Sequence, residues 1–201
     1  MKIKVYIFTA LVLTLPLGFL APQAQAGHTP THEYRIKAAF LYNFIKFVDW
    51  PKEKMADSNE PIIIGIIGED PFEKAFEPIK NKKVKGKKIV IKRFQGLEES
   101  KQSDEQTALI RKCHMLFICA SEKEKLREII NLVKDDGVLT VGEVKGFLES
   151  GGIINFLMED KKVVFEINNH AAKQARLKIR SKLLRLAKRV IPEKPSNEDK
   201  S

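Results

Sequence analysis

The sequence predicts a single three-layer α/β domain, in which helices flank a mixed, mostly parallel sheet of about six strands. Apolar runs of strand length alternate with amphipathic segments of helix length along the 201 residues, an order typical of α/β folds. Residues 61–67 form a continuous apolar run, as in a strand that is buried on both faces. Residues 153–158 and 162–168 are strand-like runs on either side of a polar turn, which predicts a C-terminal hairpin.

Local signals support the individual elements. The first helix carries a wide apolar arc and ends at Pro51. Asp70 and Pro71 are typical of a helix start, and Ser121 with Glu124 has the spacing of a capping box. In chain order, the predicted elements are a helix over 33–50, a strand over 61–67, a short helix over 70–80, a strand over 88–94, a helix over 98–111, a strand over 113–119, a helix over 121–134, strands over 138–141, 153–158 and 162–168, and a long final helix over 171–191.

The order of these elements also predicts how the sheet is connected. The first four strands should lie mostly parallel, and the hairpin should add one antiparallel member. If the first and fourth strands adjoin where the winding of the sheet reverses, the loops at 68–71 and 142–144 would flank a cleft.

The first 26 residues have the three parts of a secretory signal peptide. Lys2 and Lys4 give a positive start, an uncharged and mostly apolar stretch follows over residues 5–20, and Ala24-Gln25-Ala26 offers small residues for cleavage. The apolar stretch is shorter than a membrane-spanning helix requires. We therefore predict a signal peptide over 1–26, an exported domain over 27–191 and a disordered tail over 192–201.

The charge of the chain bears on its partners. With 36 Lys and Arg against 26 Asp and Glu, the formal net charge is +10. Export makes a nucleic acid an implausible partner in spite of this charge. A basic exported protein is better suited to an acidic protein face, an anionic lipid or an anionic small molecule.

The sequence contains no catalytic signature. It lacks the Gly-x-Ser-x-Gly and His-Glu-x-x-His motifs, and its four histidines are scattered. Cys113 and Cys119 fall at opposite ends of one predicted strand, about 20 Å apart, which is too far for a disulfide. We therefore expect no enzyme activity, no cofactor, no metal site and no bridge between these two cysteines.

The final segment offers candidate binding residues. On the predicted long helix, Lys173, Arg176 and Arg180 project beside its apolar stripe, and Asn168 and Asn169 add donors at the helix start. These five residues predict a site for a small anion or an acidic partner. Neutralisation of the cations by internal acids such as Glu166 is the alternative, and the sequence favours neither.

The first helix carries a second candidate pair. Glu33 and Lys37 are spaced i,i+4 in the favourable order, and both fall within the apolar arc of the helix. This spacing indicates a partly enclosed ion pair. A role of the pair in ligand binding, together with the final helix, is the alternative.

Motifs along most of the chain resemble the YfiR-like family. The opening motif spans residues 33–44 (EYRIKAAFLYNF) and continues to Trp50-Pro51. The closing motif spans residues 165–184 and begins FEIN. Between them lie VLTV at 138–141, Gly146-Phe147 and GGIINF at 151–156, in the family's order. The resemblance covers roughly residues 33–190.

This resemblance implies a periplasmic α/β protein that performs no catalysis. In the best-understood members it implies a repressor, which holds the periplasmic sensing domain of an inner-membrane diguanylate cyclase inactive. An outer-membrane lipoprotein or a redox change releases the cyclase, cyclic di-GMP rises and biofilm formation follows. A homodimer is compatible with this role. On this basis, the expected contacts are exposed parts of the first helix together with Lys173, Arg176 and Arg180.

Two other functions stay open from the sequence. One is a periplasmic small-ligand-binding protein that feeds a sensor or an uptake system. The other is an enzyme, for which the only support is the α/β pattern, and a fold alone does not establish a function.

Overall fold

The computed structural model describes residues 32–57, 59–97 and 104–192. The signal peptide predicted over 1–26 and residues 193–201 of the predicted tail lie outside the described residues. Among the described helices, none has the length and apolar character needed to cross a bilayer.

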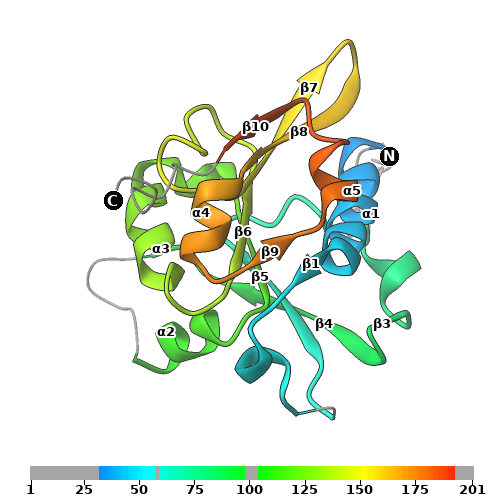
Figure 1. Cartoon of the computed structure of the whole chain (residues 1–201), viewed down its shortest axis with the longest axis vertical. Helices are drawn as coiled ribbons and strands as arrows, with labels where there is room; N and C mark the ends of the chain where they lie inside the picture. The colour runs from blue at the N-terminus through cyan, green and yellow to red at the C-terminus, as the bar shows by residue number, and fades with distance from the viewer. Residues whose placement is uncertain (1–31, 58, 98–103, 193–201) are drawn as a thin grey trace, which may run out of the picture.

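The described residues form helices on both sides of one large sheet (Figure 1). The helices are α1 (His32–Phe47), α2 (Asp104–Arg111), α3 (Leu126–Val133), α4 (Asn169–Gln174) and α5 (Ser181–Leu184), with 3₁₀ turns η1 (Lys52–Met55), η2 (Glu77–Ile79) and η3 (Ala120–Lys125). The strands are β1 (Val48–Asp49), β2 (Ile62–Ile67), β3 (Lys83–Val84), β4 (Lys87–Phe94), β5 (Met115–Ile118), β6 (Leu139–Gly142), β7 (Ile154–Glu159), β8 (Lys162–Asn168), β9 (Lys178–Ile179) and β10 (Arg189–Ile191).

Eight strands form the sheet in the order β10-β8-β7-β6-β5-β2-β4-β3, and β1 pairs separately with β9. The parallel prediction is confirmed, because β2 pairs in parallel with β4 and β5, and β5 pairs in parallel with β6. However, β5 lies between β2 and β6. The first and fourth predicted strands therefore do not adjoin, and the condition for a cleft between loops 68–71 and 142–144 is not met.

Two hydrophobic cores lie on the two faces of the sheet, as a three-layer α/β domain requires. Along β5, Phe117 enters the core that holds Phe44 of α1, whereas Leu116 and Ile118 enter the core that holds Ile129 of α3. All of these side chains are at most 1% exposed. The alternation follows from the two-residue period of a strand, and it buries both faces of the central strands.

The predicted hairpin is confirmed. β7 and β8 are antiparallel, and Glu159 is the register partner of Lys162. The two residues between them, Asp160 and Lys161, have φ values of 47° and 62°. Positive φ at both central positions is the geometry of a type I′ turn, whose twist matches that of the strands.

A buried phenylalanine explains the glycines around the start of β7. Phe147 is 0% exposed, and a Cβ added at Gly142 or Gly152 would lie 2.2 or 2.1 Å from its ring. Real Cβ atoms do not approach carbon so closely, so both positions require glycine. The two glycines therefore let the connection between β6 and β7 pack flat on the ring.

The prediction of a long final helix over 171–191 is wrong. The segment instead contains α4, β9, α5 and β10. α4 ends because Arg176 adopts a φ of 57°. The N–H of Arg176 then donates to the carbonyl of Lys173, and the N–H of Leu177 donates to that of Ala172. This pair of bonds is a Schellman motif, which usually has glycine at the position that Arg176 occupies.

Two smaller helix predictions also need correction. Asp70 accepts a hydrogen bond from the N–H of Phe72 at 2.7 Å, but the chain continues in turns and in η2 rather than as a helix. Ser121 lies within η3 and does not cap α3. Its Oγ instead accepts a hydrogen bond from the N–H of Glu69 at 3.0 Å, which joins the loops after β2 and β5.

Candidate functional site

A buried lysine lies near the start of α1. Lys37 is 3% exposed, and its Nζ contacts the carboxylate of Glu33 and lies 2.5 Å from Oε2 of Glu143, in the loop after β6. The Nζ also lies 4.5 Å from the centre of the Tyr34 ring. The ion pair indicated by the spacing of Glu33 and Lys37 is present, and the structure adds Glu143 to it.

Tyr34 completes this cluster. Its hydroxyl donates to Oε1 of Glu143 at 3.1 Å. Burial first, and then the negative charge of Glu143, raise the pKa of Tyr34 above its ordinary value, so the phenol stays protonated and acts as the donor. The polar groups of the cluster satisfy one another, and together they fasten α1 to the loop after β6.

The structure separates the cations that the sequence placed in one row. Arg180 makes two bonds to Asp49 of β1, from Nε at 3.0 Å and from Nη2 at 2.8 Å. Arg176 donates to the carbonyl oxygen of Asp135, after α3, at 3.0 Å. Both side chains are exposed, but they bind different elements. Glu166 neutralises neither of them, because it pairs with Arg189.

The other three candidates are adjacent at α4. Asn168 is the N-cap, and its Oδ1 accepts the N–H of Ala171 at 2.9 Å while its Nδ2 donates to the carbonyl of Leu148 at 3.0 Å. Asn169 begins α4 and is half-buried, and Lys173 is exposed on the same helix. The amide of Asn168 is therefore committed to the fold.

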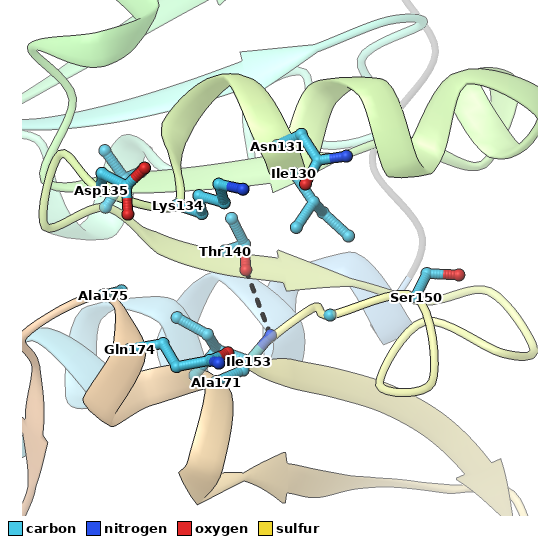
Figure 2. Close-up of a pocket in the computed structure, with 12 residues that line it drawn as sticks. Ile130, Asn131, Lys134, Asp135, Thr140, Ser150, Ile153, Ala171, Gln174 and Ala175 are labelled. Atoms are coloured by element: carbon cyan, nitrogen blue, oxygen red, sulfur yellow. Dashed lines mark hydrogen bonds between the residues drawn. The ribbon is translucent and has the colours of Figure 1, made fainter.

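A cleft of about 460 Å³ lies between α3 and α4, and we call it the α3–α4 cleft. Its floor includes Ile153, just before β7, whose N–H donates to Oγ1 of Thr140 at 3.1 Å. Figure 2 shows Asn131 of α3 and Lys134, the residue after α3, on one side of the cleft, and Gln174 of α4 on the other. The lining residues are Ile130, Asn131, Lys134, Asp135, Val138, Thr140, Ser150, Gly151, Ile153, Ala171, Gln174 and Ala175.

The α3–α4 cleft has the chemistry of a small-ligand pocket. Such pockets have volumes of about 300–1,000 Å³, with apolar walls and a few converging polar groups. Here apolar side chains form the floor, while an ammonium, a carboxylate and two amides surround the opening. The sequence does not reveal this cleft, because its walls come from separate segments between residues 130 and 175 and no motif marks them.

The two cysteines are buried and protonated. Cys113 and Cys119 are both buried and form no disulfide with each other, as their spacing predicts. Burial raises the pKa of the Cys113 thiol to about 12 and also raises that of Cys119, so neither thiol ionises at neutral pH. In the part of the chain that the structure covers, no three His, Cys, Asp or Glu residues are grouped to hold a metal ion.

Among solved structures, the chain resembles that of a conserved domain protein from Vibrio cholerae O1 biovar El Tor str. N16961. The TM-score is 0.55 at 12% sequence identity, over 78% of this chain and 60% of the Vibrio protein. At this identity the likeness concerns the fold alone, and the chain spans about three fifths of that protein. No curated protein sequence matches the chain.

A comparison of the sequence with protein families is more specific than the comparison of folds. Residues 34–188 match the YfiR/HmsC-like family. This range includes Tyr34, Lys37 and Glu143, both walls of the α3–α4 cleft, and the chain up to the residue before β10. The match covers more than half of the chain and includes the closing motif and all of the opening motif except Glu33. The protein therefore belongs to the YfiR/HmsC-like family.

Proposed function

We propose that this protein is a periplasmic regulator that represses a membrane diguanylate cyclase, and thereby controls cyclic di-GMP and biofilm formation. The observation that carries the proposal is the family match over residues 34–188. Members of this family are periplasmic regulators rather than enzymes. The signal-peptide pattern of residues 1–26 supports the same compartment.

The regulatory mechanism is a population shift. The protein must bind the inactive form of the cyclase more tightly than the active form, because equal affinity would leave the equilibrium unchanged. A preference of about 1,000-fold requires about 4 kcal/mol of differential binding free energy, which an ordinary protein interface supplies. Release by an outer-membrane lipoprotein would act by competing for this protein. The exposed side chains of Lys173, Arg176 and Arg180 remain proposed contacts.

This proposal predicts a rise in intracellular cyclic di-GMP when the gene is deleted. Complementation with the full-length protein should restore the original level, whereas a form without residues 1–26 should not, because it stays in the wrong compartment. Cyclic di-GMP is measured by mass spectrometry of cell extracts, with both forms checked for equal expression. An unchanged level in the deletion strain, under conditions where the protein is normally made, contradicts the proposal.

A second function is favoured by the α3–α4 cleft. We propose, as the alternative, that the protein binds a small ligand there and reports it to a sensor or an uptake system. The polar side chains of Asn131, Lys134 and Gln174 line an apolar floor from opposite sides, an arrangement that suits an amphiphilic molecule (Figure 2).

Calorimetry separates the alternative from a role in protein binding alone. We expect titration with nucleotides and with amino acids to give saturable heat for one class if the cleft is a ligand site. The variant Gln174→Trp obstructs the opening and should abolish that heat. The matched variant Asn59→Trp, at an exposed position outside the residues that line the cleft, should leave it unchanged. Absence of heat with both ligand classes contradicts the alternative.

A further inference from the structure

Three lysines lie over two aromatic rings of α1. The Nζ of Lys46 is 4.0 Å from the centre of the Tyr42 ring, and the Nζ of Lys82, before β3, is 5.4 Å from the same centre. The Nζ of Lys182, in α5, is 5.4 Å from the centre of the Phe47 ring. We call these five residues the basic–aromatic surface. In Figure 1, α5 and β3 lie on either side of α1. Lys182 belongs to α5, and Lys82 immediately precedes β3.

The elements of this surface are held together by backbone pairing. β1, which follows α1 directly, pairs with β9, and the N–H of Arg180 donates to the carbonyl of Phe47 at 2.9 Å. On the other side of α1, the Nζ of Lys85, just after β3, donates to the carbonyl of Val48 at 2.5 Å. Segments far apart in the sequence are therefore held at the C-terminal end of α1, where each brings a lysine to a ring of that helix.

Positive charge on this surface is not neutralised within the described part of the chain. Asp49, in β1, is already bound by Lys85 at 3.1 Å and by Arg180 at 2.8 Å. No carboxylate among the described residues pairs with Lys46, Lys82 or Lys182. By contrast, the cations beyond this surface include several with carboxylate partners, namely Lys37, Arg93, Arg111, Lys188 and Arg189.

The rings give these lysines a defined position. Tyr42 and Phe47 are half-buried against the core below α1. An ammonium over an aromatic face is attracted by the ring, by about 0.5–1 kcal/mol at an exposed site. This attraction does not cancel the positive charge, but it reduces the conformational freedom that a lysine loses when it meets an anion.

We infer that the basic–aromatic surface binds an acidic protein surface. Charge complementarity requires an anionic partner, and long-range attraction would speed its approach. An anionic bilayer is the other source of negative charge, but peripheral membrane binding also uses an apolar face that enters the lipid. The rings here lie beneath the lysines. The exposed large apolar side chains of the described residues are Val90, Met158 and Leu186, and none of them belongs to the basic–aromatic surface.

The inference is independent of the proposed function, because it concerns the chemistry of the partner and not its identity.

Binding to this surface is tested with a fluorescein-labelled oligoglutamate peptide, by fluorescence anisotropy at low ionic strength. The triple variant Lys46→Glu, Lys82→Glu, Lys182→Glu should weaken binding by at least about tenfold. The control Lys123→Glu, Lys145→Glu, Lys161→Glu has the same net charge but reverses exposed lysines elsewhere, and it should change the affinity much less.

Each outcome decides the inference. An equal loss of affinity in the two triple variants means that only net charge matters, and overturns it. Vesicles containing phosphatidylglycerol provide the second probe: if the first triple variant loses vesicle binding but keeps its affinity for the peptide, the surface binds membrane and the inference is wrong. Circular dichroism checks that each variant is folded. If the first does not fold, the corresponding glutamine variants replace both sets.

Discussion

Replacing Lys37 by methionine is expected to lower the free energy of unfolding by about 3–5 kcal/mol, because it leaves a buried carboxylate without its cation. The side chain of Glu143 is 10% exposed, and its remaining partner would be the hydroxyl of Tyr34. Glu33 should matter less, since its side chain is 34% exposed and can be hydrated. Urea unfolding followed by circular dichroism measures the change.

Two controls make the Lys37 result specific. Lys46→Met removes a lysine from the same helix that has no carboxylate partner among the described residues, and it should cost much less. The double variant Lys37→Met, Glu143→Gln removes both charges and keeps an acceptor for Tyr34, so it should recover much of the lost stability. A single Lys37 variant as stable as the Lys46 variant would show that the buried cluster contributes little.

Acidification is expected to destabilise the protein through His114. This side chain is 4% exposed, its Nδ1 accepts the N–H of Ile63 at 3.2 Å, and its Nε2 lies 3.1 Å from the carbonyl oxygen of Lys54. The geometry fits a neutral imidazole that donates from Nε2. Burial, and secondarily the charge of Lys54, lower the pKa of His114 from 6.5 to about 4.

The sign of the pH effect follows from this difference. Between pH 6.5 and 4 the unfolded chain binds a proton at His114 and the folded chain does not. Stability is therefore retained above pH 6.5 and falls as the pH drops through this window, by about 3 kcal/mol in all.

Unfolding experiments at intervals across this pH range test the His114 prediction. Glutamine at position 114 can accept and donate in the same manner and does not titrate, so His114→Gln should remove most of the slope above pH 5. If the wild type and the variant lose stability in parallel across that range, another group is responsible.

The strands were predictable because their signals are local. A run such as residues 61–67 contains enough apolar side chains to require burial on both faces, whatever its neighbours are. The hairpin turn is equally local, since Asp160 and Lys161 decide it. The final helix failed for the opposite reason. Residues 171–191 have helical spacing and no glycine or proline before Pro192, yet Arg176 takes the left-handed conformation and β9 pairs with β1, some 130 residues earlier.

In the candidate site, too, local contacts could be predicted from the sequence and long-range contacts could not. The contact between Glu33 and Lys37 is set by one turn of helix, so its spacing predicts it. Glu143 is more than a hundred residues from Lys37, and only the position of β6 beside α1 brings them together. The row of Lys173, Arg176 and Arg180 depended on a continuous helix and was separated when that helix ended at Gln174.

The pairing of β1 with β9 has a consequence for the order of folding. The segment that follows the first helix obtains its strand partner only when residues 178–179 have been made, and β10 then joins the sheet edge beside β8. Contacts of such long sequence separation slow folding, because a large loop must close before they form. A domain whose first segment finds its strand partner near residue 178 stays incompletely folded during synthesis, and this delay is what the export proposed above requires.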